Sequence, residues 1–516
     1  MAYTVEQKIK GRIYLYKVES YWDKAKKQSR QRRTYIGPKR NVNKDKTKQI
    51  RSSLVSKGQG NVFLLRFLSD KLGLTEILKS LFPDNYQEIL ALAFYEIIEA
   101  SALYLFPYWL DEHNLPRVKK MYSPDISKLC DILGRSQSQR VEFVQKWIEH
   151  LKPISGIFYD ITSISSYSTN VDFIEWGYNR DKENLPQLNM GVTFCHNHSL
   201  PIYYNLYPGS IVDVTTLKNC VEYLKVFKLK DILFVLDRGF FSKANVLEMN
   251  NSKSKVSFVQ PLPFSLKKVK TLIKKNKRLL SDLSSAFKFN EEILHYQQRP
   301  FEFDGNEFDA HIFFNEKSEV EQKHNFFSVL FEYEEKFKDK SFKVLKEYLK
   351  YRKLNIPEKY RDYFKWNKTT LRIEKNAKKI KSFIYKMGSF VLITNKQQMD
   401  KAEVLNLYRQ KDQVEKMFDI YKNEMNGDRL RAHSQYNVDG RLFIKFVALI
   451  IYAEASRVMK EKKLFNKYTV KELFAELKKL KITHIEKNDP ILSELSKRQK
   501  IIFDAFGIQE DTLHSY

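Results

Sequence analysis

Two short apolar runs, one with an aspartate in its middle and one that ends on an aspartate, constrain the fold of this chain more than any other feature. The first is Ile157-Phe-Tyr-Asp160-Ile-Thr-Ser-Ile, and the second is Asp231-Ile-Leu-Phe-Val-Leu-Asp237. Their β-branched and aromatic residues predict buried strands. Buried strands rarely carry carboxylates, because an unpaired charge away from water is costly. Asp160 and Asp237 therefore need partners, which are either a structural salt bridge or a divalent cation that takes several carboxylate oxygens.

A third acid, Glu415, lies in a stretch from Lys401 to Met425 that has no Pro or Gly. Its apolar residues recur at helical spacing. On a helix with about 100° per residue, Tyr408, Lys411 and Lys422 lie on the same face as Glu415. This polar stripe has two interpretations. It is either a solvated helix face with a Lys-Glu pair four residues apart, or part of a site shared with the two aspartates.

The order of the predicted elements around these acids is that of a ribonuclease-H-like α/β fold. A strand with Asp160 is followed by a hairpin, a helix, the strand with Asp237, a helix, a strand and the helix with Glu415. Two segments, residues 256–260 and 388–395, are candidates for the last strand. We therefore predict a ribonuclease-H-like catalytic core that is interrupted by a β-rich or mixed insertion.

These motifs resemble the DDE transposases of the IS4 and IS1634 insertion-sequence group. The resemblance covers about residues 155–425 and is carried by Asp160-Ile-Thr, Gly209 with Asp213 and Thr216, Asp237-Arg-Gly-Phe-Phe, Phe390-Val-Leu-Ile-Thr-Asn, and Tyr408-x-x-Lys411-x-x-x-Glu415-x-x-x-x-x-x-Lys422. One position departs from the group, because many of its members have Arg where this chain has Lys411. Lysine keeps the charge but lacks the bidentate fork of arginine.

The resemblance implies a metal-dependent enzyme that acts on double-stranded DNA. It implies that Asp160, Asp237 and Glu415 are the catalytic residues and hold two Mg²⁺ ions, for which Mn²⁺ substitutes. It further implies DNA contacts from a second set of residues, namely Tyr408, Lys411, Lys422 and Arg238. The implied reaction is binding at inverted-repeat transposon ends, cleavage that exposes a 3′-OH, and strand transfer into target DNA.

The formal net charge of +28 is consistent with a polyanionic partner, nucleic acid first and an acidic membrane surface second. The abundance of Lys, Asn, Ile, Phe and Tyr gives the charge an alternative origin in codon bias. The longest apolar runs contain charged residues and are shorter than the roughly 20 residues of a membrane span. The three cysteines have no metal-ligand spacing, so we expect neither a disulfide framework nor a zinc site. We expect a cytoplasmic, nucleoid-associated protein with no membrane partner.

Composition along the chain predicts six regions. They are a basic N-terminal β-hairpin region (1–60), a helical DNA-binding module (61–152), the first part of the catalytic core (153–262), an insertion subdomain (263–387), the second part of the core with the Glu415 helix (388–430), and a C-terminal helical region (431–516). In the helical module, Gly134 is expected to follow the end of a helix that begins at Ser123. In the C-terminal region, an apolar helix is expected from about Gly440, and Thr469 with Glu472 forms a capping box for a later one.

Several alternatives stay open at this level. The basic hairpin and the lysine-rich insertion either contact DNA or are solvated surface. The C-terminal helices either pair two protomers, as in related transposases that act as dimers, or belong to the core. The whole chain is a transposase, another ribonuclease-H-like metal nuclease, or a non-catalytic DNA-binding protein derived from a transposase.

Overall fold

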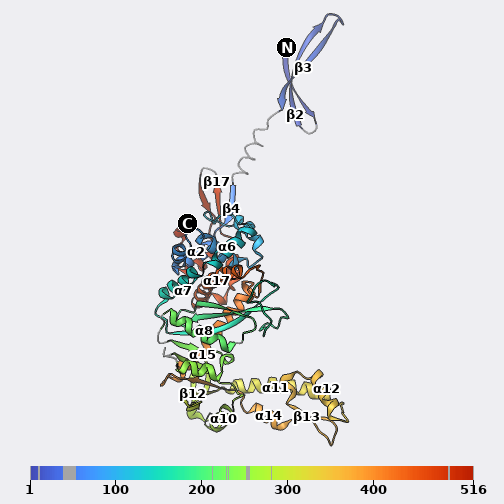
Figure 1. The fold of residues 1–516 in the computed structure, drawn as a ribbon. Coiled ribbons are helices and arrows are strands. Elements are labelled where there is room, and N and C mark those ends of the chain that lie inside the picture. Colours follow the sequence, from blue (N-terminus) through green and yellow to red (C-terminus); the bar gives the residue numbers. More distant parts are fainter. Residues whose placement is uncertain are drawn as a thin grey trace.

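The computed structural model describes residues 2–9, 12–38, 54–211, 213–227, 229, 232–251, 256–280, 282–485 and 488–514. The chain has a mixed α/β fold with one large mixed sheet, and the helices that precede and follow the sheet in sequence lie together on one side of it (Figure 1). Of the predicted region 1–60, residues 39–53 lie outside the described residues.

Within the described residues, ten strands form the large sheet. In spatial order they are β10 (Ala286–Phe289), β11 (Glu292–Phe303), β12 (Asn306–Phe314), β15 (Ser389–Thr394), β9 (Ser257–Pro261), β8 (Leu233–Val235), β5 (Gly156–Ser166), β6 (Gln187–Cys195) and β7 (Leu200–Pro208), with β16 (Arg429–Leu430) paired to β5. Strand β5 is parallel to β8, and β8 is parallel to β9. Strands β5, β6 and β7 are antiparallel neighbours.

Both candidates for the last core strand belong to this sheet. Strand β9 is parallel to β8, and β15 lies antiparallel on the far side of β9. The two helices that connect the core strands are α8 (Asp213–Val226) and α9 (Lys243–Asn251). The side chain of Asp213, which belongs to the predicted motif, lies outside the described residues.

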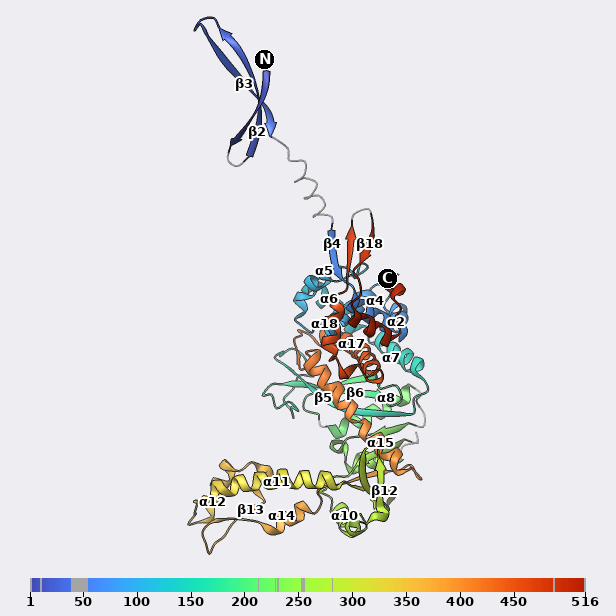
Figure 2. The same cartoon turned by 180° about the vertical axis from the view of Figure 1, so that it is seen from behind.

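The helices on one side of the sheet come from both ends of the chain. They are α2 (Gly60–Lys71), α3 (Leu74–Leu81), α4 (Tyr86–Ile98), α5 (Phe106–Glu112), α6 (Ser123–Arg135), α7 (Gln137–Leu151), α17 (Gln435–Glu461), α18 (Val470–Lys478) and α19 (Lys497–Phe506). Helix α17 is at the centre of this group and is buried along most of its length, because its apolar residues cover every side of it. Figure 2 shows it between the other helices and the sheet. Of the two roles open for the C-terminal helices, α17 therefore has the core role.

Two helix boundaries differ from expectation for one physical reason. Gly134 lies inside α6, and Gly440 lies inside α17, which begins at Gln435 with Ser434 as its N-cap. A Cβ added to Gly134 would lie 1.9 Å from the carbonyl oxygen of Tyr436, and one added to Gly440 would lie 1.9 Å from that of Cys130. The glycines are therefore needed where α6 and α17 cross, not where a helix ends. The capping box of Thr469 and Glu472 is confirmed at the start of α18.

Two three-stranded sheets of the described residues lie outside the core. The first has the order β1 (Ala2–Ile9), β2 (Arg12–Asp23), β3 (Gln28–Pro38), so the expected N-terminal hairpin has a third strand. The second joins β4 (Leu54–Gly58) to β17 (Lys481–Ile485) and β18 (Asn488–Leu492). This second sheet connects the residues before α2 with the C-terminal region.

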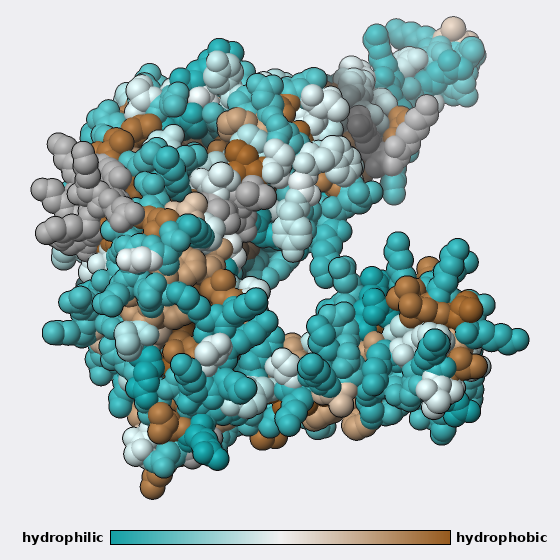
Figure 3. Space-filling view, turned by 60° about the horizontal axis from the view of Figure 1, so that its bottom comes forward, coloured by the Kyte–Doolittle hydropathy of each residue, from teal (hydrophilic) through white to brown (hydrophobic). Residues whose placement is uncertain are grey.

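The segment between β9 and β15 differs from the expected separate insertion, because its first strands extend the large sheet. After α10 (Lys267–Leu280), strands β10 to β12 add to β15. The rest is mostly helical and forms a lobe of its own, lower right in Figure 3, with a mainly hydrophilic surface. Its elements are α11 (Glu316–Phe337), α12 (Leu345–Asn355), α13 (Glu358–Arg361), β13 (Phe364–Trp366), β14 (Ile373–Lys375) and α14 (Ala377–Ile384). A small hydrophobic core of its own supports this lobe, made of Phe326, Leu330, Phe337, Ile356, Phe364 and Met387.

Among the described helices, none is by itself both long and apolar enough to cross a membrane. Residues Tyr86–Ile98 and Leu103–Glu112 pass that test only as a pair, and the pair is bent by 113°.

Candidate active site

The two aspartates lie next to each other because their strands are parallel neighbours. Phe158 of β5 pairs with Val235 of β8. Asp160 and Asp237 each come two residues further along, at the same end of the sheet. Asp160 lies within β5, and Asp237 is the N-cap of the short 3₁₀ helix η2 (Arg238–Phe240), which follows β8.

The stretch that carries Glu415 is helical, but it is not the one continuous α-helix that its sequence predicts. It consists of α15 (Lys401–Gln410), a turn at Lys411, α16 (Asp412–Asp419) and the π-helix η4 (Ile420–Glu424). Its apolar side chains are buried against the core as predicted, namely Leu407, Val414, Phe418, Tyr421 and Met425.

Lys411 joins the acids of the strands to the acid of the helix. Its Nζ lies 2.9 Å from an oxygen of Asp237 and 2.6 Å from an oxygen of Glu415, and its side chain is only 7% exposed. The predicted Lys-Glu pair is therefore present, but it is not a solvated surface pair, because the same ammonium also holds Asp237.

The pKa values of these groups are shifted in different directions from their ordinary values. Burial raises the pKa of Asp160 to about 6, although the N–H of Ile161 and the charge of Lys411 oppose the rise. Burial alone would also raise the pKa of Asp237, but Lys411 and the backbone N–H groups of η2 hold it below its ordinary value. Burial alone would lower the pKa of Lys411, yet its carboxylate partners raise it. The site therefore favours an ammonium between carboxylates.

These donors are suitable for a divalent metal ion. Within the part of the chain that the structure describes, no three His, Cys, Asp or Glu side chains are already arranged around a common metal position. The ammonium of Lys411 lies between Asp237 and Glu415, and its charge also acts on Asp160. Two carboxylates thus share one cation, and Asp160 lies on the parallel strand next to that of Asp237. Carboxylate oxygens are the ligands that hard divalent ions prefer.

Tyr408 and Arg238 lie beside the acids. The ring of Tyr408 stacks on Phe390 with centroids 6.0 Å apart, and burial raises its pKa. The guanidinium of Arg238 lies 5.4 Å from the ring centroid of Phe264.

Lys386 shares the aromatic partner of Arg238 and was not found from the sequence. Its Nζ lies 5.3 Å from the centroid of the same Phe264 ring. Burial lowers the pKa of Lys386, and the charges of Lys270 and Arg238 lower it further. These cations repel one another, and an anion such as a phosphate bound beside them would relieve this repulsion. In the sequence, Lys386 is one of many lysines in the insertion and has no distinguishing pattern.

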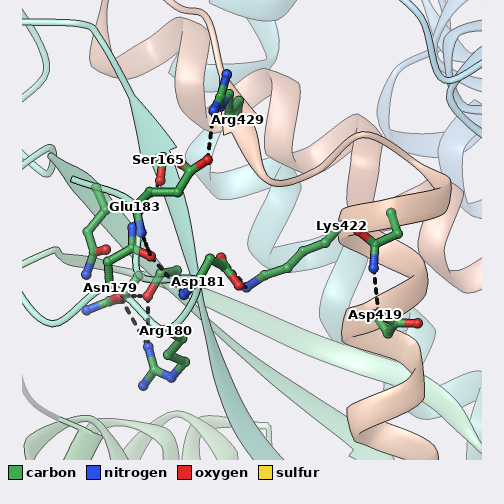
Figure 4. A network of polar contacts seen from close by, with 12 residues as sticks. Ser165, Asn179, Arg180, Asp181, Glu183, Asp419, Lys422 and Arg429 are labelled. Carbon is green, nitrogen blue, oxygen red and sulfur yellow. Dashed lines mark hydrogen bonds and ion pairs between the residues drawn. The ribbon is translucent and has the colours of Figure 1, made fainter. Parts of the chain in front are cut away.

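Lys422 lies in the π-helix and is paired to a loop instead of to Glu415. Its Nζ lies 2.7 and 2.6 Å from the two carboxylate oxygens of Asp181, in the loop of residues 167–186 between β5 and β6. Arg429 pairs in the same way with Glu183 at 2.8 Å. Figure 4 shows both carboxylates pointing from the loop toward the cations.

The loop is held by buried hydrogen bonds close to the acids. The amide of Asn179 donates to Ser165 Oγ at 3.0 Å, and its oxygen accepts from the N–H of Asp181 at 2.8 Å. Arg180 donates to Ser163 Oγ at 3.1 Å, and its charge acts on Asp160. The sequence predicts a polar loop here but indicates no role for it, because residues 167–186 show neither helical nor strand periodicity.

Comparison with known proteins gives two findings. The profile of the family described as "Transposase DDE domain" matches residues 151–451, which is more than half of the chain. Among solved structures, the cryo-electron microscopy structure of a piggyBac transposase synaptic complex with hairpin DNA is similar at 9% sequence identity. Its TM-score is 0.34, and the match covers 88% of this chain and 72% of that one. Comparison with curated proteins gives no match.

Proposed function

The chain belongs to the transposase DDE domain family, and we propose that it is an active transposase of the IS4 and IS1634 type. It binds the inverted-repeat ends of its own insertion sequence as double-stranded DNA, cleaves the strands and transfers them to target DNA. The observation that carries the proposal is that Lys411 binds both Asp237 and Glu415, while Asp160 lies on the parallel strand next to that of Asp237.

The order of strands supports a ribonuclease-H-like core. Strands β5, β6 and β7 form the antiparallel part, and β8 and β9 follow in parallel on the other side of β5. This is the succession of strand, hairpin, helix, strand, helix and strand that the sequence predicts around the acids. In such a core the carboxylates meet at one end of the central strands, where Asp160 and Asp237 lie.

Asp160, Asp237 and Glu415 are the residues that would hold two Mg²⁺ ions, for which Mn²⁺ substitutes. When bound, such ions activate the attacking oxygen and stabilise the leaving oxygen of a phosphodiester. Lys411 keeps Asp237 and Glu415 together and neutralises part of their charge. It also supplies a positive charge to a phosphate that lies against the acids.

Arg238 and Lys386 would contact the DNA backbone on the η2 side of the site, where they share Phe264. Tyr408 is held by its stacking on Phe390 and lies within the field of Lys411 and Asp237. Lys422 and Arg429 would contact the backbone on the other side, where Asp181 and Glu183 now neutralise them. We propose that the enzyme pairs two ends as a homodimer. Because α17 is a core helix, the protomers would pair through other surfaces.

The decisive experiment is the substitution Glu415→Gln, which keeps size and hydrogen bonding but removes the charge that a metal ligand needs. We expect Mg²⁺- or Mn²⁺-dependent nicking of a duplex with the terminal inverted repeat to be lost, while binding of that duplex persists. Glu403→Gln on α15, where the carboxylate is also exposed, is the matched control and should cleave normally. If Glu415→Gln nicks at the parent rate, Glu415 is not a metal ligand and the proposed site is wrong.

A further inference from the structure

The N-terminal sheet β1–β3 has two chemically different faces. Side chains alternate between the faces of a strand, and directly paired residues on neighbouring strands share a face. Tyr3 of β1 pairs with Val18 of β2, and Val18 pairs with Arg33 of β3. These three side chains therefore lie on one face, and their neighbours in sequence lie on the other.

One face, the acidic face, carries the carboxylates of the three strands. Glu6, Glu19 and Asp23 all fall on it by the strand register. Two of its cations pair with these acids, Lys17 with Glu19 at 2.5 Å and Arg30 with Asp23 at 3.6 Å. The cations of the acidic face, which also include Lys8 and Arg32, are therefore largely balanced by its three carboxylates.

The opposite face, the aromatic face, has no carboxylate among the described residues of the three strands. Its centre is a cluster of tyrosine rings, in which Tyr35 lies 6.0 Å from Tyr14 and 5.5 Å from Tyr16. The rings surround Val18, which is fully buried. Around this cluster the face presents the polar side chains of Tyr3, Gln7, Gln31 and Arg33.

Several side chains of the aromatic face are exposed although they are large and apolar. Trp22 is 62% exposed, Tyr35 is 53% exposed and Tyr3 is 49% exposed. Gln31 and Arg33 are exposed as well, and the amide of Gln31 donates to the hydroxyl of Tyr3 at 3.1 Å, which orients it. The aromatic face thus offers oriented, acid-free hydrogen-bonding groups on a small rigid base.

We propose that the aromatic face of β1–β3 enters the major groove of the terminal inverted repeat and contacts its base edges. The major groove admits a two-stranded β-ribbon, and sheets are used in this way by several DNA-binding proteins. Arginine and glutamine are the side chains that make paired hydrogen bonds with guanine and adenine. Gln31 and Arg33 are two residues apart on β3 and therefore share the acid-free face, so both point toward the same groove. This inference rests on the proposed function, because it assigns the element that recognises the transposon end.

Neighbouring arginines on opposite faces provide a matched test. Arg33 lies on the aromatic face and Arg32 on the acidic face, and both are exposed. The probes are a labelled duplex with the terminal inverted repeat and a scrambled duplex of equal length, both bound by the full chain. We expect Arg33→Ala to weaken binding of the repeat roughly 5- to 150-fold, which corresponds to about 1–3 kcal/mol for one bidentate contact, and to leave the scrambled duplex nearly unaffected. Gln31→Ala should act in the same direction, and Arg32→Ala should change both duplexes little and equally.

The outcomes separate the two proposals. If the parent protein neither prefers nor nicks the repeat, the proposed function fails and this inference fails with it. If the parent binds and nicks the repeat but Arg33→Ala and Arg32→Ala act alike, only the aromatic face is wrongly assigned. If Arg33→Ala changes the size of the protein assembly and not its preference for the repeat, the face is a protein contact and the inference is overturned.

Discussion

The ion pair between Lys445 and Glu96 provides a quantitative test of how the Glu415 stretch is anchored. Lys445 of α17 lies 2.6 Å from Glu96 of α4, with side chains 5% and 7% exposed. The same ammonium donates to the carbonyl of Met425 at 2.7 Å, directly after the π-helix η4. One buried cation thus connects an N-terminal helix, a C-terminal helix and the end of the segment that carries Glu415.

Replacing one residue of the Lys445–Glu96 pair should lower the free energy of unfolding far more than replacing both. Lys445→Met leaves the buried carboxylate of Glu96 without a counter-charge, and such a change costs about 3–5 kcal/mol. The double substitution Glu96→Leu with Lys445→Met replaces the pair by apolar groups, which is often nearly neutral. The carbonyl of Met425 still loses its donor, and this costs about 1–3 kcal/mol. We therefore expect the single variant to be the less stable of the two.

Amide hydrogen exchange of α17 measures this difference as the free energy of local opening. At about 1.4 kcal/mol per factor of ten, Lys445→Met should speed the exchange of α17 amides between roughly 100-fold and a few thousand-fold. The double variant should recover most of that change. Lys146→Met breaks an exposed pair with Glu142, whose side chains are 39% and 50% exposed, and should change exchange by less than about fivefold because such pairs contribute 0–1 kcal/mol. Equal exchange in the single and double variants would refute the argument.

Three further predictions concern binding and pH. DNA affinity should fall steeply with salt in a gel-shift titration, with a slope of log K against log salt concentration of about −0.9 per phosphate contact. An affinity that does not change with salt would show that the positive charge of +28 does not reflect DNA binding. Asp181→Asn removes the carboxylate that neutralises Lys422, so binding of the transposon end should tighten severalfold. Lys422→Ala should weaken binding and reduce the salt slope by about one. If Asp181→Asn weakens binding instead, the loop positions Lys422 and does not compete with DNA. Two ammonium groups hold the pKa of Glu319 below its ordinary value of 4.5, although burial opposes them. The carboxylate therefore stabilises the insertion above pH 4.5, and this contribution is lost as the pH falls through the lowered pKa. Urea unfolding of the insertion at several pH values should show this loss of stability in acid for the parent and not for Glu319→Gln.

The convergence of the two aspartates could be predicted from the sequence, because it depends on strands alone. An apolar run with an acid inside it predicts a buried strand with an unsatisfied charge. Once both runs are strands of a parallel pair, Asp160 and Asp237 must meet at the same end. The division of the N-terminal sheet into two faces could not be predicted in the same way. It depends on the register of β1, and residues 2–9 were not predicted to form a strand.

The position of Lys422 could not be predicted, because it depends on a change in helix type. On a continuous α-helix with about 100° per residue, Lys422 would lie on the same face as Glu415. The turn at Lys411 and the π-helix from Ile420 to Glu424 both change that count. In a π-helix each N–H bonds to the fifth residue before it, so side chains after Asp419 are rotated away from the α-helical phase. Neither break has a Pro or Gly to mark it.

The break in the helix has a functional consequence. On a continuous helix, Lys411 and Lys422 would both project on the side of Glu415. In the structure, Lys411 is directed into the acids, while Lys422 is directed toward Asp181 and the loop of residues 167–186. If the proposed function holds, we expect the two lysines to act at different points along a bound strand, Lys411 at the site of cleavage and Lys422 beside it. Substituting Lys422 should consequently change affinity with little effect on the rate of nicking at saturating DNA, whereas substituting Lys411 should change the rate. If both substitutions lower the rate equally at saturation, both lysines act in the cleavage step, and the π-helix has no role in separating their functions.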